Sequence, residues 1–194
     1  MPTKLQTTRH GFNMAKLIIG TYDKKSKSKQ KGISMKKALI VGLNRYPGHE
    51  LHWCDNDAMA ISTPIESNGD GSPNFEVIQI IDTCTKGQLL EAITRLFADD
   101  ADVALLYFSG HGSDKDGGYL VTTDFIPEAL GVKMEDVLEL ANESKCKNKV
   151  IILDCCFAAK MGESLLVNNK TVLGEGVTIM AASQTWNHPW RTLP

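Results

Sequence analysis

The chain has 194 residues, of which 42% are hydrophobic, and a formal net charge of −2 at pH 7. This length and composition predict one globular domain with a sizeable core. The near-neutral charge gives no general attraction to nucleic acid or anionic membranes, so neither is expected as a partner. The longest uninterrupted apolar run is six residues, far too short for a membrane-spanning helix. Five cysteines are an odd number, which fits reduced thiols in a cytoplasmic protein better than a disulfide framework.

The first 34 residues differ in composition from the remainder. Five lysines fall within residues 24–31, with no apolar side chain between them. Such a block repels itself and is typical of a solvated linker. We therefore expect residues 1–34 to be a disordered or weakly structured extension with a lysine-rich linker. Residues 35–194 are expected to form the folded domain.

After residue 35, apolar runs alternate with amphipathic stretches. Runs with the length of buried strands occupy residues 37–43, 76–81, 103–108, 149–153 and 176–182. Apolar side chains recur at helical spacing in residues 58–65, 89–97 and 134–141. A capping box, Thr85 with Gln88, precedes the second helix, and residues 118–124 have an extended pattern. Strands that alternate with helices predict an α/β fold with a mainly parallel sheet.

Two of the predicted strands lead into chemically reactive residues. Residues 103–108 are followed by Ser-Gly-His-Gly at 109–112, and residues 149–153 by Asp-Cys-Cys at 154–156. In open parallel sheets, ligands bind just beyond the carboxyl ends of the strands. A histidine and a thiol at this edge of the sheet would provide a nucleophile and its base.

Two adjacent thiols compete for the role of nucleophile. Side chains alternate along a strand, so Asp154 and Cys156 are expected to point to one face and Cys155 to the other. Ser109 and His111 share a face by the same argument. Burial as a small apolar residue is the commonest fate of a free cysteine. We therefore predict that Cys155 packs in the core and that Cys156 is the nucleophile.

These paired motifs resemble the catalytic core of the caspase and metacaspase superfamily, over about residues 36–184. The order and spacing of histidine and cysteine fit, and the Asp-x-Cys context is closer to metacaspases and bacterial caspase-like proteins than to animal caspases. The resemblance implies a three-layer α/β/α sandwich with a mainly parallel central sheet. It also implies a cysteine endopeptidase with His111 as base and Cys156 as nucleophile. The amides of Gly112 and Cys156 would form the oxyanion hole.

The resemblance further implies a substrate-binding pocket. Metacaspases build a pocket for basic side chains from positions that correspond here to Cys54, Asp57, Ser109 and Asp154. Two carboxylates would attract Arg or Lys and repel aspartate. The expected partners are therefore protein or peptide substrates with basic residues. The alternatives are a helix cap for Asp57 and the cap of a following turn for Asp154.

Other positions depart from the family. Relatives often have His-Ser-Gly after the nucleophile, whereas residues 157–159 are Phe-Ala-Ala. Relatives also continue into a sixth strand, which is missing from this sequence, so we expect an open sheet edge that promotes self-association. Lys160 and Lys170 lie in the predicted loop after the nucleophile. Relatives are often cut there during activation, which makes these two lysines candidate self-cleavage sites.

No cofactor and no structural metal are expected. Some metacaspases need calcium, for which Asp114, Asp116 and Asp124 are the available acids. No spaced loop resembles a calcium hand, so solvated loop acids are the favoured interpretation. Two other functions remain as alternatives. One is an inactive caspase-like interaction or regulatory module, and the other is a redox-sensing thiol protein built on Cys155 and Cys156.

Overall fold

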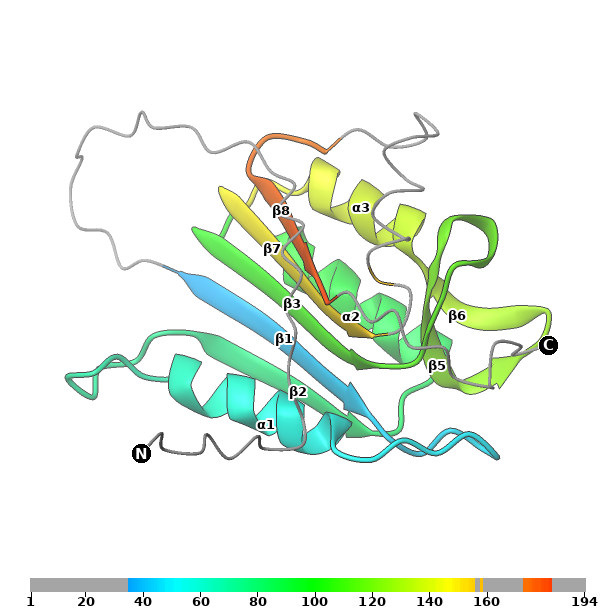
Figure 1. Cartoon of the computed structure of the whole chain (residues 1–194). Helices are drawn as coiled ribbons and strands as arrows, with labels where there is room; N and C mark the ends of the chain where they lie inside the picture. Colours follow the sequence, from blue (N-terminus) through cyan, green and yellow to red (C-terminus); the bar gives the residue numbers. More distant parts are fainter. Residues whose placement is uncertain (1–34, 156–157, 159–172, 183–194) are drawn as a thin grey trace, which may run out of the picture.

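The computed structural model describes residues 35–155, 158 and 173–182. At its centre is a five-stranded parallel sheet with the order β2-β1-β3-β7-β8 (Figure 1). The strands are β1 (Lys36–Leu43), β2 (Glu76–Asp82), β3 (Val103–Gly110), β7 (Asn148–Cys155) and β8 (Val177–Ala181). The predicted α/β class and parallel sheet are confirmed. The expectations for residues 1–34 and for a missing sixth strand after residue 182 concern segments outside the described residues.

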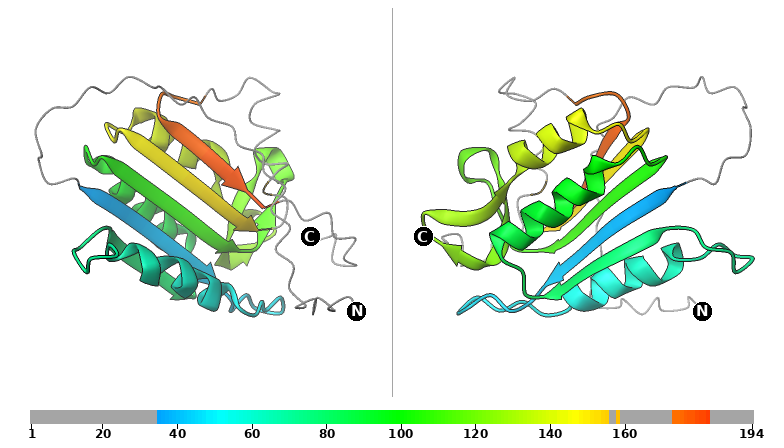
Figure 2. Two further views of the ribbon diagram at one scale, coloured as in Figure 1. Left: turned by 60° about the vertical axis from the view of Figure 1, so that its left-hand side comes forward. Right: turned by 180° about the vertical axis from the view of Figure 1, so that it is seen from behind.

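Helices cover both faces of this sheet, which gives the expected three layers (Figure 2). α1 (Cys54–Ile65) lies on one face, where its Ala58 packs with side chains of β1 and β3. α2 (Lys86–Ala98) and α3 (Met134–Glu143) lie on the opposite face. Each helix presents an apolar stripe to the sheet, as its spacing predicted.

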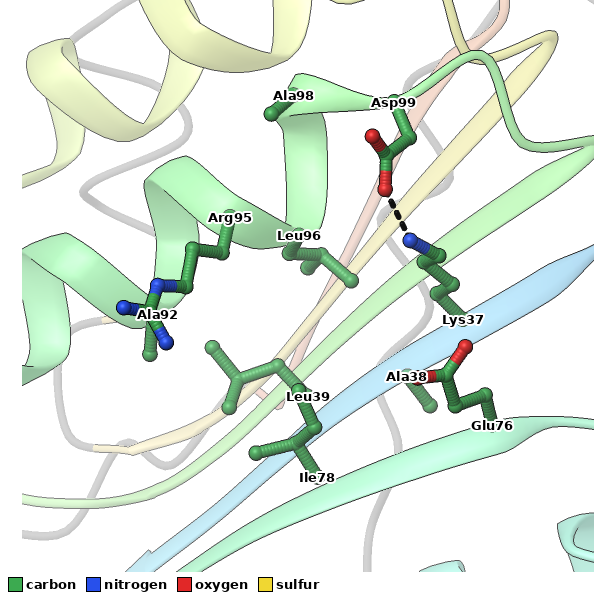
Figure 3. Close-up of a pocket in the computed structure, with 10 residues that line it drawn as sticks. All are labelled: Lys37, Ala38, Leu39, Glu76, Ile78, Ala92, Arg95, Leu96, Ala98 and Asp99. Carbon is green, nitrogen blue, oxygen red and sulfur yellow. Dashed lines mark hydrogen bonds and ion pairs between the residues drawn. The ribbon is translucent and has the colours of Figure 1, made fainter.

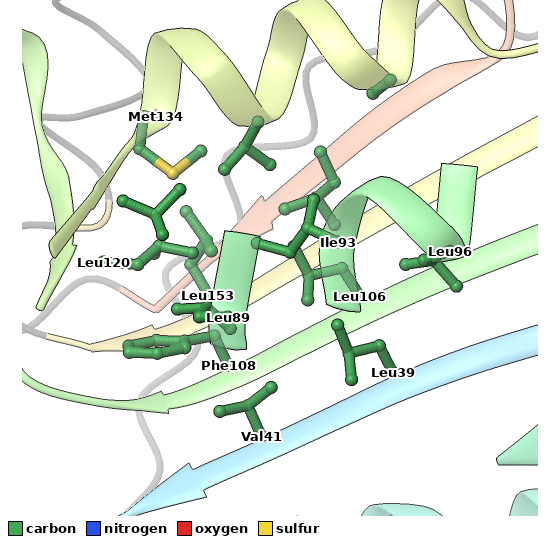
Figure 4. Close-up of a cluster of buried hydrophobic side chains, with 14 of the residues drawn as sticks. Leu39, Val41, Leu89, Ile93, Leu96, Leu106, Phe108, Leu120, Met134 and Leu153 are labelled. Atoms are coloured by element: carbon green, nitrogen blue, oxygen red, sulfur yellow. The ribbon is translucent and has the colours of Figure 1, made fainter. Parts of the chain in front are cut away.

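The larger part of the core lies between the sheet and the helices α2 and α3 (Figure 4). Leu106 and Phe108 of β3 point into it, whereas Leu105 and Tyr107 point towards α1. Burial of each such apolar side chain contributes about 1.5–3 kcal/mol. The same alternation places Cys155, at the end of β7, in this larger core with 8% of its surface exposed. The prediction that Cys155 is a core residue is confirmed.

A small antiparallel sheet lies beyond the carboxyl end of β3. It consists of β4 (Gly112–Ser113), β5 (Tyr119–Ile126) and β6 (Ala129–Lys133), and a 3-10 turn (Lys115–Gly117) precedes β5. The extended pattern predicted for residues 118–124 corresponds to β5. The sequence did not indicate β6, which is short and has a glycine at its centre. That glycine is required, because a Cβ at Gly131 would lie 2.1 Å from the Leu120 carbonyl oxygen.

Side chains from two directions hold the N-terminus of α2. Thr85 and Gln88 form the predicted capping box. Asp124 of β5 adds a second contact, because its Oδ1 accepts a hydrogen bond from the Lys86 backbone N–H at 3.0 Å. Carboxylates stabilise the positive end of a helix. Asp124, one of the three acids considered for calcium, therefore has a structural role at the start of α2.

A cavity of about 290 Å³ opens between β1, β2 and α2 (Figure 3). It lies near the amino ends of the strands, since Lys37 and Glu76 are at the beginnings of β1 and β2. Lys37 forms an ion pair with Asp99 there. The strand ends that carry the candidate catalytic residues are at the other end of the sheet.

Candidate active site

The ends of β3 and β7 lie side by side in the sheet. Ser109 is the register partner of Asp154, and Gly110 is the register partner of Cys155. His111 directly follows β3 and Cys156 directly follows β7. The structure thus brings together the strand ends that precede the two predicted catalytic residues. Cys156 itself is outside the described residues.

Two residues of the segment after β1 hold His111. Its backbone N–H donates to the Tyr46 hydroxyl at 3.1 Å, and its Nε2 lies 2.8 Å from the His49 carbonyl oxygen. A carbonyl oxygen can only accept a hydrogen bond, so Nε2 carries the hydrogen. In the neutral ring, the other nitrogen, Nδ1, is then the one with a free lone pair. This tautomer has Nδ1 ready to accept a proton.

The surroundings of His111 also favour the neutral ring. Burial lowers the pKa of His111 below its usual value, because the protonated ring loses hydration. The hydrogen bond to the His49 carbonyl opposes this shift, and the charge of the His49 ring lowers the pKa further. His111 is therefore neutral near pH 7, as a general base must be.

Tyr46 links His111 to the small sheet. Its side chain is fully buried, and its hydroxyl accepts from the His111 N–H while donating to the Val121 carbonyl oxygen at 3.0 Å. The rings of Tyr46 and His111 also meet edge-on, with centroids 4.5 Å apart. A Cβ at Gly110 would lie 2.5 Å from the Tyr46 hydroxyl oxygen, so this approach requires glycine. Sequence reasoning missed Tyr46, which lies outside the predicted strands and helices.

Gly112 begins β4 one residue after His111 and is the register partner of Leu120. Its amide was predicted to contribute to an oxyanion hole. The other predicted donor, the amide of Cys156, is outside the described residues, as are Lys160 and Lys170.

A second group of polar side chains lies on the α1 face of the sheet. Ser109 is 3% exposed and follows Tyr107 by two positions on β3, so both side chains point towards α1. The Tyr107 hydroxyl donates to Asp154 Oδ2 at 3.1 Å. Burial raises the pKa of Tyr107, and the charge of Asp154 raises it further, so Tyr107 stays protonated. Tyr107 has the appearance of an ordinary apolar strand residue in the sequence, which is why its polar role was not predicted.

The N-terminus of α1 completes this group. α1 approaches β1 closely at Gly42, where a Cβ would lie 2.2 Å from the Cys54 carbonyl oxygen. The Asn44 side chain accepts from the Cys54 backbone N–H at 3.1 Å and so satisfies the first amide of the helix. The Ser109 hydroxyl is within hydrogen-bonding reach of the Cys54 thiol. Asp57 lies in the first turn of α1, and the N-cap position itself is Trp53.

The charges in this group act on one another. Burial raises the pKa of Asp154 above its usual value; the Tyr107 hydrogen bond opposes this shift, and the negative charge of Asp57 adds to it. Burial also raises the pKa of the Cys54 thiol, and Asp57 and Asp154 contribute to that increase. The four residues predicted to form a pocket are therefore close enough to interact. Two repelling carboxylates in a partly buried site would be stabilised by a cation between them.

The described cysteines are Cys54, Cys84, Cys146 and Cys155, and all four are buried and form no disulfide with one another. Within residues 35–155, 158 and 173–182, no three His, Cys, Asp or Glu side chains gather closely enough to hold a metal ion. Within the same residues, no helix has the length and apolar character needed to cross a membrane.

A parallel α/β sandwich with a histidine and an acid–thiol motif after neighbouring strands defines a caspase-like cysteine peptidase domain. Residues 35–188 match the family model of the caspase domain, and the chain belongs to this family of cysteine peptidases. The match agrees with the extent expected from the motifs. No curated protein matches the chain. Membership of the metacaspase branch stays a prediction.

Proposed function

We propose that this protein is a cysteine endopeptidase that cleaves polypeptides after Arg or Lys, with His111 as general base and Cys156 as nucleophile. The observation that supports this specificity is the pair of interacting carboxylates, Asp57 and Asp154, beside the buried Ser109 hydroxyl. A guanidinium or ammonium group between the carboxylates would remove their mutual repulsion and form charge-assisted hydrogen bonds. An aspartate side chain would add a third negative charge.

The proposed reaction uses the tautomer described above. Nδ1 of His111 takes the proton of the Cys156 thiol, and the thiolate sulfur attacks the scissile carbonyl carbon. Negative charge on the carbonyl oxygen is held by the amides of Gly112 and Cys156, each such donor contributing about 3–4 kcal/mol. His111 then gives its proton to the leaving amine as the C–N bond breaks. Water, deprotonated by His111, hydrolyses the thioester and restores the thiol.

Fluorogenic peptides ending in Arg, Lys or Asp test this proposal directly. We expect the wild-type chain to release the fluorophore after Arg and Lys and not after Asp. Cys156→Ala should abolish release, and Cys155→Ala should retain most of it. If no peptide is hydrolysed and no thiol-reactive peptide inhibitor labels the chain, the non-catalytic interaction module is the better interpretation.

Three further expectations belong to this proposal. Lys160 and Lys170 would be processed by an enzyme with this specificity, since both are basic residues in the predicted loop after Cys156. The chain would self-associate through an open sheet edge. It would act in the cytoplasm, where its thiols remain reduced.

A further inference from the structure

A phenylalanine would satisfy the apolar packing around Tyr107 equally well, so the hydroxyl group of Tyr107 is not needed for packing. The side chain is 4% exposed and packs with Ala38, Ile40 and Ala58 between the sheet and α1. A buried tyrosine hydroxyl needs a hydrogen-bond partner. Here the partner is Oδ2 of Asp154, the carboxylate that stands at the end of β7. The hydroxyl thus connects the apolar interior to the polar group.

We propose that Tyr107 is a positioning residue for substrate selection, whose hydroxyl fixes the Asp154 carboxylate by one oxygen and leaves the other for the basic side chain of the substrate. This inference rests on the proposed function, because it assigns Asp154 to the recognition of Arg or Lys. It extends that function to a residue that need not touch the substrate.

The groups around Asp154 explain why it needs such a donor. From α1, Asp57 opposes the ionisation of Asp154 through its negative charge, and the Cys54 thiol interacts with the same carboxylate. From β3, the Tyr107 hydroxyl is the group that favours the ionised form. β8, the other neighbour of β7, has the sequence Val-Thr-Ile-Met-Ala and no titratable side chain.

Ser109, two residues after Tyr107 on the same face of β3, supports the same arrangement. Its hydroxyl is within hydrogen-bonding reach of Tyr107, and it lowers the pKa of Tyr107 against the larger effect of burial. A hydroxyl that donates to the Tyr107 oxygen strengthens Tyr107 as a donor to Asp154. The Tyr107 hydroxyl thus has the Ser109 hydroxyl close to it and the Asp154 carboxylate as its hydrogen-bond acceptor.

Tyr107→Phe removes one oxygen atom and keeps the ring, so the packing with α1 should remain. Loss of a hydrogen bond to the ionised form raises the pKa of a carboxyl group. Asp154 should therefore be protonated at higher pH in the variant. We expect the KM for peptides ending in Arg to rise roughly tenfold, because the lost donor served a charged acceptor. The kcat should fall less, since His111 keeps its own contacts to Tyr46 and His49.

Two measurements on the 194-residue chain test the inference. The first is a carboxyl ¹³C NMR titration of Asp154, with and without Tyr107→Phe, in a Cys156→Ala background that prevents self-cleavage. The second is the pH profile of kcat/KM for an Arg-ending peptide with Cys156 intact. We expect Tyr107→Phe to move both the Asp154 titration and the acid limb of the profile to higher pH. Tyr119→Phe, on β5 beside Lys133, is the matched control and should move neither.

The outcomes distinguish a failure of the proposed function from a failure of the role assigned to Tyr107. A wild-type chain that cleaves no peptide after Arg or Lys would overturn the proposed function, and the selection role of Tyr107 with it. Normal cleavage with an unchanged Asp154 titration in Tyr107→Phe would overturn the role of Tyr107 alone. If Tyr107→Phe fails to fold by circular dichroism, Ser109→Ala takes its place. That variant should shift the Asp154 titration in the same direction by a smaller amount, and an unshifted titration would contradict the inference.

Discussion

Ser109 and Asp154 are register partners across the β3–β7 ladder, on the side of the sheet that α1 covers. They are 45 positions apart in the sequence, and parallel pairing alone places them next to each other. One residue beyond the β3 end is His111, and one beyond the β7 end is Cys156. The same pair of strand ends therefore carries the residues proposed for substrate recognition, Ser109 and Asp154. It also leads directly into those proposed for catalysis, His111 and Cys156.

The two adjacent cysteines should respond differently to substitution. Cys155→Ala removes a sulfur atom from the core between the sheet and the helices α2 and α3, and we expect a loss of about 1 kcal/mol in the free energy of unfolding. Peptide cleavage at a permissive temperature should be retained. Cys156→Ala should abolish cleavage. Labelling by a thiol-reactive peptide inhibitor, detected by intact mass, should be retained in Cys155→Ala and lost in Cys156→Ala. An inactive but folded Cys155→Ala chain would show that the strand register has been misassigned.

Asp154→Asn should separate activity from stability. The pKa of Asp154 is raised in the folded state, so between the unfolded value near 3.8 and the folded value the native chain binds more protons than the unfolded one. Stability is therefore lost as pH rises through that window, and at pH 7 the ionised carboxylate is unfavourable for folding. We expect Asp154→Asn to have an equal or higher melting temperature at pH 7 than the wild type.

Cleavage after Arg should nevertheless fall at least about tenfold in Asp154→Asn, because the charge that pairs with the substrate is gone. Asp124→Asn provides the matched control, since Asp124 is also a hydrogen-bonded carboxylate but lies at the start of α2. It should reduce stability and leave the preference for Arg unchanged. A melting temperature that drops in Asp154→Asn together with the activity would argue for a structural role of Asp154.

The parts of the fold that the sequence predicted are those with a local repeating pattern. The apolar runs predicted the five strands, and alternation along β7 was enough to predict that Cys155 is buried. Tyr46 and Tyr107 were missed because their hydroxyl partners, Val121 and Asp154, are 75 and 47 positions away. Such contacts leave no periodic signal. The four residues predicted to form a pocket were proposed only through resemblance to a family, since their spacing alone predicts nothing.

Acid should destabilise the chain partly through His111. Burial lowers the pKa of His111 in the folded state, so below about pH 6.5 the unfolded chain takes up a proton that the native chain resists. Stability therefore decreases as pH falls from 6.5 towards the folded value. We expect the unfolding free energy of His111→Gln, measured by urea denaturation, to decrease less than that of the wild type between pH 7 and pH 5.5. Equal decreases would show that His111 is not buried as a neutral ring.

Gly110 and Tyr46 should show strong coupling in a double-mutant cycle. Gly110→Ala places a Cβ 2.5 Å from the Tyr46 hydroxyl oxygen, so the tyrosine or the strand end must move. Tyr46→Phe removes that oxygen, and with it the hydrogen bonds that the Tyr46 hydroxyl forms with the His111 N–H and the Val121 carbonyl. This loss should lower the free energy of unfolding by about 1–3 kcal/mol. Both single variants should lower kcat and change KM less, because both disturb the position of His111.

The double variant Gly110→Ala/Tyr46→Phe should be less destabilised than the sum of the two single variants, because the phenyl ring leaves room for the new methyl group. Recovery will be partial, since the added Cβ also lies 3.1 Å from the ring of Phe108. Urea denaturation of the four chains measures the coupling free energy. Gly87→Ala combined with Tyr46→Phe is the comparison in which no such relief is expected, because a Cβ at Gly87 has no neighbouring atom within 4 Å. Simple additivity in the Gly110–Tyr46 pair would mean that the close approach of the Tyr46 hydroxyl to β3 is not what requires glycine at position 110.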